Sequence, residues 1–232
     1  MESDGNMALH LRRLSHAWPG QAPLIRIEEL QLPQGQHLFI QGPSGCGKST
    51  LLSLLAGVQP VQQGVCQVLG QNLSELPPIQ RDRLRGEHMG VIFQQFNLLP
   101  FLDAQANALL PTKLFPSRAN AASKAFGSPF QQAQSLAQSL GLSASLWRQP
   151  VHQLSVGQQQ RVAAVRALMG QPQLIIADEP TSALDDANQL EFLDLLLNTA
   201  EKQGASVVMV SHNARLADRF HQVYVWPTQE AA

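Results

Sequence analysis

A glycine-rich segment between two patterned runs limits how this chain can fold more than any other feature. Residues 37–41 are mostly apolar and predict a strand, and Lys48–Ala56 alternates polar and apolar residues at helical spacing. The segment between them, Gly42-Pro-Ser-Gly-Cys-Gly-Lys-Ser49, matches G-x-x-x-x-G-K-[ST] at every fixed position. Glycines in such a loop allow tight bends that direct several N–H groups to one point. A strand, this loop and a helix in that order predict a phosphate-binding loop.

The loop and the helix after it offer different contacts to a bound phosphate chain. The helix N-terminus carries a partial positive charge beside the loop. Lys48 adds a mobile cation for the β- and γ-phosphates, and the Ser49 hydroxyl is suited to ligate Mg²⁺. The predicted nucleotide-binding residues are therefore Gly42, Pro43, Ser44, Gly45, Cys46, Gly47, Lys48, Ser49 and Thr50.

Length, charge and cysteine content restrict the remaining possibilities. A chain of 232 residues is long enough to bury a substantial core, and its formal net charge of −1 gives no reason to expect nucleic acid as a partner. The longest clean apolar run, residues 51–58, is far shorter than the ~20 residues that cross a bilayer. Two cysteines predict neither a disulfide framework nor a zinc site. We expect a cytosolic protein with reduced thiols.

Two further apolar runs end in polar side chains. Leu174–Glu179 predicts a buried strand that finishes with Asp178 and Glu179, and Val207–Val210 predicts another that is followed by His212. Parallel strands end at one edge of a sheet, where open α/β sheets bind ligands. There Asp178 is suited to hold magnesium and Glu179 to take a proton from water. The alternatives are acids that cap the next helix and a structural histidine.

The rest of the chain contains a helical stretch and two ambiguous residues. Residues 102–150 show helical patterns, with interruptions expected at Pro111, Pro116, Gly127-Ser-Pro129 and Gly141. Ser155 precedes a predicted helix over residues 159–169, where it is either a structural cap or part of a second anion site. Trp18, in a turn region, is either a half-buried turn aromatic or a platform for an adenine ring.

Together these segments resemble the nucleotide-binding subunit of ABC transporters over essentially the whole chain. GPSGCGKST corresponds to the Walker A loop, LSVGQQQR to the signature, LIIADEP to Walker B, SALD to the D-loop and His212 to the switch histidine. Gln94 in VIFQQFNLLP corresponds to the Q-loop glutamine, with Gln95 as the alternative. The same resemblance places Trp18 where the family carries its adenine-stacking aromatic. Val156 departs from the usual L-S-G-G-Q signature. RLRGEHMGVIFQQFNLLP and the short length resemble the MacB/LolD/FtsE-like group.

The resemblance implies an α/β fold: a P-loop NTPase (RecA-like) core with an N-terminal antiparallel β layer and an inserted α-helical subdomain. A single ABC ATPase domain is expected over residues 1–232. Residues 1–96 and 166–232 are expected to form the core with its β layer, and residues 97–165 the helical subdomain that carries the signature.

The resemblance further implies a composite active site. Two copies are expected to face each other head to tail with two ATP molecules between them. Ser155, Gly157 and Gln158 are the signature residues expected to act in trans, and Asp185 is the D-loop residue. Glu179, His212, Gln94 and Lys48 are the expected catalytic residues, and Ser49, Gln94 and Asp178 the expected Mg²⁺ ligands.

The resemblance also implies partners and a location. ATP and Mg²⁺ are the expected cofactors, and closure of the homodimer is expected to drive an integral membrane permease for export, lipoprotein extraction or mechanotransmission. The chain is then cytoplasmic and peripheral on the inner face of the membrane, with no nucleic acid bound. Two alternatives stay open: an FtsE-like ATPase that regulates a cell-envelope process without transport, and a soluble ABC ATPase that acts on nucleic acid or ribosomes.

Overall fold

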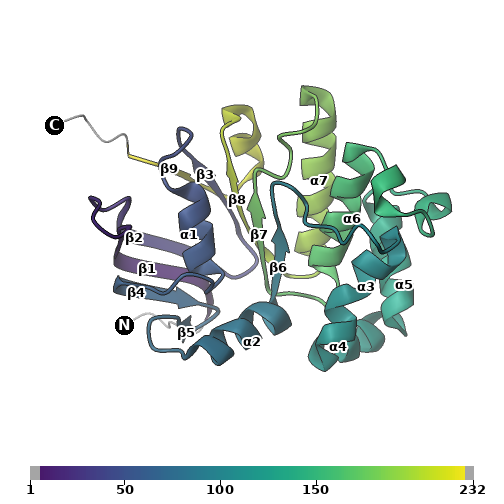
Figure 1. Ribbon diagram of the computed structural model, residues 1–232, viewed down its shortest axis with the longest axis horizontal. Helices are drawn as coiled ribbons and strands as arrows, with labels where there is room; N and C mark the ends of the chain where they lie inside the picture. The colour runs from purple at the N-terminus through teal and green to yellow at the C-terminus, as the bar shows by residue number, and fades with distance from the viewer. Residues whose placement is uncertain (1–5, 228–232) are drawn as a thin grey trace.

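Two β-sheets and a group of helices form the fold (Figure 1). The computed structural model describes residues 6–227, so residues 1–5 and 228–232 of the expected domain lie outside the described residues. A four-stranded antiparallel sheet contains β1 (Met7–His16), β2 (Ile25–Pro33), β4 (Gln63–Val68) and β5 (Gln71–Asn72). A five-stranded parallel sheet contains β3 (His37–Gln41), β6 (Met89–Ile92), β7 (Leu174–Asp178), β8 (Ser206–Ser211) and β9 (Gln222–Val225).

Helices cover the parallel sheet and extend to one side of it. They are α1 (Lys48–Leu55), α2 (Pro78–His88), α3 (Ala104–Leu114), α4 (Pro116–Phe126), α5 (Pro129–Ser139), α6 (Val156–Leu168) and α7 (Asp186–Lys202), with short 3₁₀ helices η2 (Ala144–Leu146), η3 (Val151–Gln153) and η4 (Ala214–Arg219). Within residues 6–227, no helix combines the length and the apolar composition needed to span a bilayer. The expected mixed α/β fold with an N-terminal antiparallel layer is confirmed.

The parallel sheet runs in the order β6-β7-β8-β3-β9, and its inner strands β7, β8 and β3 are buried on both faces, whereas Val223 and Val225 of the edge strand β9 are exposed. Alternate residues of a strand enter different cores. On β3, Phe39 joins the core beneath α6 and α7, whereas Leu38 and Ile40 join the core around α1 and the antiparallel sheet. Because both faces of β3, β7 and β8 are covered, the interiors of these strands are apolar, as the sequence predicted.

The register of the parallel strands determines where the loops after them begin. Gln41 of β3 pairs with Ser211 of β8, and Asp178 of β7 pairs with Val210 of the same strand. The loops that follow β3, β7 and β8 therefore leave from one edge of the sheet. The sequence predicted that the segments after these three strands meet at one edge of the sheet, and the structure places them there.

A two-residue turn joins β4 to β5. Leu69 and Gly70 form the turn, with φ of 52° and 76°, and Gln71–Asn72 is the strand β5, paired with β4. Positive φ at both central residues is the geometry of a two-residue hairpin. A leucine in that conformation carries no turn signal in the sequence.

Pro111 does not interrupt a helix, contrary to expectation. α3 continues through it, and Phe115 donates its N–H to the Pro111 carbonyl (3.0 Å). The packing of α3 against α6 outweighs the local cost of an interior proline. α6 is itself continuous from Val156 to Leu168, so the expected subdomain boundary at residue 166 falls inside a helix, and the division of the domain stays a prediction.

Arg118 of α4 connects the inserted helices to the core through buried hydrogen bonds. Its side chain is 2% exposed, and its guanidinium donates hydrogen bonds to the carbonyl oxygens of Met169 (2.9 Å), Glu87 (3.3 Å) and Met89. Burial lowers the pKa of Arg118 to about 10. Gly170 leaves room for this side chain, since a Cβ there would lie 2.4 Å from Arg118 Cβ.

We predict that Arg118→Ala lowers the free energy of unfolding by about 2–4 kcal/mol, because three carbonyls lose their donor and a buried volume is emptied. Urea unfolding followed by circular dichroism measures the change. Lys124→Ala removes an exposed cation from the same helix and should change stability by less than about 1 kcal/mol. If both variants had the same free energy of unfolding, Arg118 would not stabilise the contact between the inserted helices and the core.

Candidate active site

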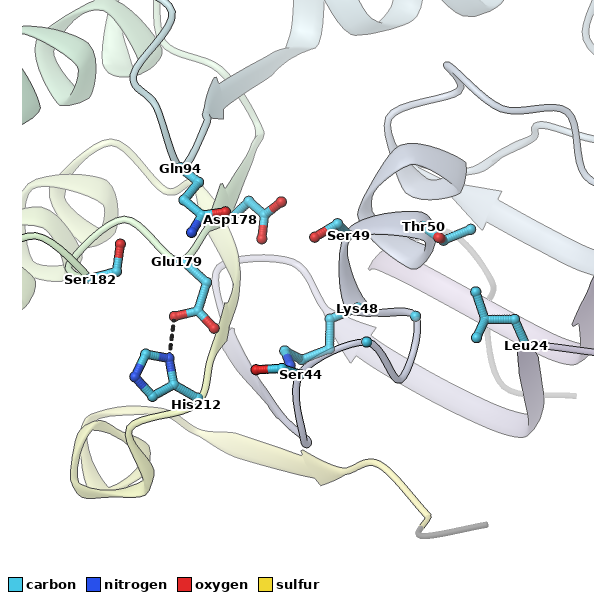
Figure 2. A pocket seen from close by; sticks show the side chains of 12 residues that line it. Leu24, Ser44, Lys48, Ser49, Thr50, Gln94, Asp178, Glu179, Ser182 and His212 are labelled. Atoms are coloured by element: carbon cyan, nitrogen blue, oxygen red, sulfur yellow. Dashed lines mark hydrogen bonds and ion pairs between the residues drawn. The ribbon is translucent and has the colours of Figure 1, made fainter. Parts of the chain in front are cut away.

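One cleft gathers most of the residues that the sequence analysis singled out. It encloses about 420 Å³, and Figure 2 shows side chains from several loops converging on it. Its lining consists of Leu24, Ser44, Gly45, Gly47, Lys48, Ser49, Thr50, Gln94, Asp178, Glu179, Ser182 and His212. The segments after β3, β6, β7 and β8 thus contribute to a single site.

The phosphate loop, residues 42–49, has a backbone that favours glycine. φ is +79° at Gly45 and +111° at Gly47, and Gly47 is also the N-cap of α1. The first turn of α1 contains no acidic residue, and it lines the cleft with Lys48, Ser49 and Thr50. The positive end of α1 therefore opens into the cleft, where it suits an anion.

Lys48 supplies the positive charge of this loop. The residue is 8% exposed, and its ammonium donates to the carbonyl oxygens of Gly42 and Pro43, both at 2.8 Å. Neutral carbonyls satisfy its hydrogen bonds but do not neutralise its charge. The ammonium is therefore ready to exchange these partners for phosphate oxygens.

Trp226 and Leu24 pack against the back of the phosphate loop. A Cβ at Gly42 would lie 2.7 Å from Trp226 Cβ. A Cβ at Gly47 would lie 2.9 Å from Leu24 Cγ and 3.4 Å from the Trp226 ring. Trp226 is 5% exposed, and its backbone N–H donates to the Gln41 carbonyl (2.7 Å). Both glycines are needed for this close packing, which holds the loop in place from behind.

Glu179 leaves the strand that was expected to include it. β7 ends at Asp178, and Glu179 has φ of +46°, a left-handed conformation uncommon outside glycine. Its N–H donates to the Val210 carbonyl (3.0 Å), which holds the residue beside β8. Strained backbone of this kind collects at functional sites, and here it places the carboxylate in the cleft.

Glu179 and His212 form an acid–histidine pair. Glu179 Oε2 lies 3.0 Å from His212 Nδ1 (Figure 2). The Glu179 side chain is 13% exposed and the His212 side chain 63% exposed, so the ring stands at the mouth of the cleft and the carboxylate inside it. A carboxylate oriented in this way is a suitable base for a water molecule.

Asp178, Ser49 and Gln94 fit a magnesium ion. Asp178 Oδ1 is buried and has no hydrogen-bond partner among the described residues, a costly arrangement for a carboxylate oxygen. All three side chains line the cleft (Figure 2). Mg²⁺ takes such oxygen ligands together with substrate phosphates. Within residues 6–227, no cluster of three or more His, Cys, Asp or Glu side chains could hold a metal ion.

The loop that carries Gln94 is held by α6. Arg166 donates to the carbonyl oxygens of Phe96 (2.5 Å) and Asn97 (2.7 Å). These two residues have left-handed backbone conformations, with φ of 59° and 48°. Burial lowers the pKa of Arg166. A displacement of α6 therefore acts directly on the loop after Gln94.

Several predicted site residues do not line this cleft. They are Trp18, Gly42, Pro43, Cys46, Ser155, Gly157, Gln158 and Asp185. Three of them belong to the phosphate loop itself. Trp18 is 39% exposed, with its ring edge-on to His16 and the centroids 5.4 Å apart. The roles of these residues stay predictions.

Ser155 caps α6, and the helix starts three residues earlier than expected. The Ser155 hydroxyl oxygen accepts from the Gln158 N–H (3.3 Å), and the Gln158 side chain accepts from the Ser155 N–H (2.9 Å), a reciprocal capping box. The Ser155 hydroxyl keeps its proton for another acceptor. Val156 is the first helical residue and is 49% exposed, so it lies in the helix and not in the loop.

Two lining residues, Leu24 and Ser182, were not among the predicted site residues. Leu24 directly precedes β2, and an apolar residue there does not differ in sequence from a core residue. Ser182 donates its N–H to the Glu179 carbonyl (3.2 Å). Its place three residues after Glu179 was the signal that could have identified it.

Comparison with known proteins identifies the family. Residues 26–182 match the family model described as ABC transporter. The chain belongs to the ABC transporter family. Over 88% of its length, this ABC ATP-binding chain is 35% identical to the lipoprotein-releasing system ATP-binding protein LolD of Hydrogenovibrio crunogenus, and it covers 85% of that protein. Over 90% of its length it is 36% identical to the uncharacterized ABC transporter ATP-binding protein YbbA of Escherichia coli, of which it covers 89%.

Longer proteins and solved structures are also similar to the ABC chain. It is 35% identical, over 87% of its length, to the macrolide export ATP-binding/permease protein MacB of Rhodopirellula baltica, but it spans only 28% of that protein. The dimeric structure of MJ0796, a bacterial ABC transporter cassette, has a TM-score of 0.80 at 28% identity, with 94% of this chain and 93% of that chain covered. A dimeric post-hydrolysis structure of the same cassette, bound to ADP and Pi, has a TM-score of 0.79. The P-loop NTPase fold expected from the sequence is confirmed.

We predict that Trp226→Ala in this ABC domain weakens ATP binding about tenfold, because the phosphate loop loses the ring packed behind Gly42 and Gly47. Trp226→Phe keeps a ring in that place and should retain most of the affinity. Titration calorimetry with ATP gives the Kd of each variant. Val225→Ala truncates the neighbouring, 64% exposed side chain and is the matched control. A Kd for Trp226→Ala equal to that of the control would show that the loop holds its shape without this support.

Proposed function

We propose that this chain binds ATP with Mg²⁺ and hydrolyses it as one of two identical subunits in a complex with an integral membrane permease of the MacB/LolD-like type. The convergence of three groups in one cleft carries this proposal. They are the phosphate loop with Lys48, the buried Asp178 oxygen without a partner among the described residues, and the Glu179–His212 pair. Each supplies a different part of phosphoryl transfer to water.

The phosphate loop binds the triphosphate. Its N–H groups and the positive end of α1 meet the phosphate oxygens, and Lys48 leaves the carbonyls of Gly42 and Pro43 for the β- and γ-phosphates. Trp18 stacks on the adenine ring. Magnesium, when held by Ser49, Gln94 and Asp178, neutralises charge on the phosphates.

Glu179 and His212 act on the far side of the γ-phosphate. Glu179 accepts a proton from the attacking water, since its carboxylate is already oriented by the histidine at 3.0 Å. His212, at the mouth of the cleft, contacts the γ-phosphate. Lys48 stabilises the charge that develops on the transferred group.

A second copy of the chain completes the site. Ser155, Gly157 and Gln158 do not line the cleft of their own chain, and the capped Ser155 retains a hydroxyl proton to donate. In a head-to-tail homodimer these residues and Asp185 meet the ATP bound to the other copy. The MJ0796 cassette, to which this chain is similar, is dimeric. ATP then bridges the two copies, and hydrolysis removes the bridge.

Closure of the dimer moves a membrane partner. Arg166 joins α6 to the loop after Gln94, so movement at the signature displaces that loop. The names of the relatives, a lipoprotein-releasing system for LolD and macrolide export for MacB, support a permease of that type. The chain is then held on the cytoplasmic face of the membrane through the permease, and the coupling between ATP and permease is reciprocal in binding free energy.

We predict that Glu179→Gln retains ATP affinity but lowers the rate of ATP hydrolysis at least about 100-fold, because the amide cannot take the proton from water. An ATP-bound dimer should then accumulate, measurable by size-exclusion chromatography with light scattering. Glu201→Gln makes the same change on the exposed surface of α7 and should turn over normally. Normal turnover of Glu179→Gln would remove this residue from the role of base.

The membrane partner is tested separately. We predict that the tagged full-length chain, purified from detergent-solubilised membranes of its own cells, brings down an integral membrane protein in a fixed ratio. The Glu179→Gln variant with ATP should retain that protein. Recovery of RNA or ribosomes in its place would contradict the permease partner while leaving the ATPase assignment intact.

A further inference from the structure

Two polar side chains join the loop that carries His212 to the segment before α7. Asn213 Nδ2 donates to Gln189 Oε1 (2.8 Å), and Gln189 Nε2 donates to the Leu184 carbonyl (2.8 Å). Asn213 directly follows His212, and Leu184 directly precedes Asp185, the N-cap of α7. One glutamine of α7 therefore connects the loop after β8 to segment 182–185.

Backbone groups fix the direction of this hydrogen-bond chain. At one end the Leu184 carbonyl only accepts, so Gln189 must present its NH₂ group to it. At the other end the Arg215 N–H donates to Asn213 Oδ1 (3.2 Å), so Asn213 presents its NH₂ group to Gln189. Turning either amide over would place like groups against each other. The link therefore has a single arrangement.

The link reaches the reacting groups at one end and the signature at the other. His212, beside Asn213, is paired with Glu179 at 3.0 Å. Leu184 lies against the start of α6, since a Cβ at Gly157 would be 3.4 Å from Leu184 Cδ2. A continuous series of contacts thus runs from the Glu179–His212 pair to the signature of the same chain.

Burial distinguishes this link from the ion pair beside it. Arg215 of η4 and Asp186, the first residue of α7, form an ion pair at 2.9 Å, but their side chains are 79% and 71% exposed, and exposed ion pairs contribute little. Gln189 and Asn213 are partly buried. Neither lines the cleft, so any effect on the reaction passes through His212 and Glu179.

We propose that Gln189 and Asn213 are positioning residues. They make the orientation of the Glu179–His212 pair depend on the position of segment 182–185. The proposal rests on the proposed function, in which Asp185 and the signature meet a second copy of this chain. Contact of that copy with segment 182–185 passes through Gln189 to the loop of His212, so Glu179 is oriented for hydrolysis when the dimer is closed. ATP binding uses the phosphate loop and does not depend on the link.

Changing one polar group tests the link. Asn213→Asp keeps the shape of the side chain and the acceptor for the Arg215 N–H, but it turns an oxygen toward Gln189 Oε1. We expect kcat for ATP hydrolysis to fall about tenfold and KM for ATP to change less than about twofold, because the lost interaction acts in the reaction step. Asn198→Asp makes the same change on the exposed surface of α7 and should leave both constants at the wild-type values.

A compensating variant separates positioning from structural damage. In Asn213→Asp combined with Gln189→Lys, the ammonium can donate both to the Leu184 carbonyl and to the new carboxylate, and most of kcat should return. Two results would contradict the inference while the wild-type chain still hydrolyses ATP. In the first, Asn213→Asp has the same kcat and KM as Asn198→Asp; in the second, kcat of the double variant is no higher than that of Asn213→Asp. If the wild-type chain fails to hydrolyse ATP with Mg²⁺, the proposed function fails and the inference with it.

Discussion

The pairing of β8 with β3 on one side and with β7 on the other determines where the phosphate loop, Glu179 and His212 lie. The phosphate loop follows β3, Glu179 follows β7 and His212 follows β8, each within one or two residues of the strand end. A slip of two residues in either pairing would displace one of these groups by roughly 7 Å. A contact of 3.0 Å between Glu179 and His212 does not survive such a shift. The two cores therefore fix the catalytic geometry, because they bury both faces of these strands and so specify their register.

The charges in the cleft specify the kind of ligand that completes it. Lys48 is a nearly buried cation held by carbonyls, and Asp178 presents a buried carboxylate oxygen that has no hydrogen-bond partner among residues 6–227. A bare anion would satisfy the first group and repel the second, whereas a bare cation would do the reverse. A phosphate chain that carries its own metal ion satisfies both. The cleft is thus suited to a metal-bound nucleotide more than to either component alone.

Sequence patterns predicted the parts of the site that depend on adjacent residues. The glycine loop and the Ser155 cap are local arrangements of backbone and side chain, so a short window of sequence contains all the necessary information. The pattern of buried parallel strands also predicted that the segments after β3, β7 and β8 meet at one edge of the sheet, but the individual contacts between these distant segments were not predictable. Trp226 supports Gly42 from the other end of the chain, and the left-handed conformation of Glu179 depends on β8. The predicted strand was one residue too long, because it included Glu179, whereas β7 ends at Asp178. The contact that turns Glu179 out of the strand comes from β8, which lies far along the sequence.

α6 connects the signature to both sides of the cleft through direct contacts. It is a continuous 13-residue helix about 20 Å long, so its two ends move together. Near its C-terminus Arg166 holds the loop after Gln94, and at its N-terminus Gly157 lies against Leu184. The first contact leads to a proposed metal ligand and the second, through Gln189, to the proposed base. In the proposed homodimer, a second copy that contacts the signature would therefore act on the metal side and the water side of that chain's own cleft together, and coordinated hydrolysis at two sites requires such a coupling.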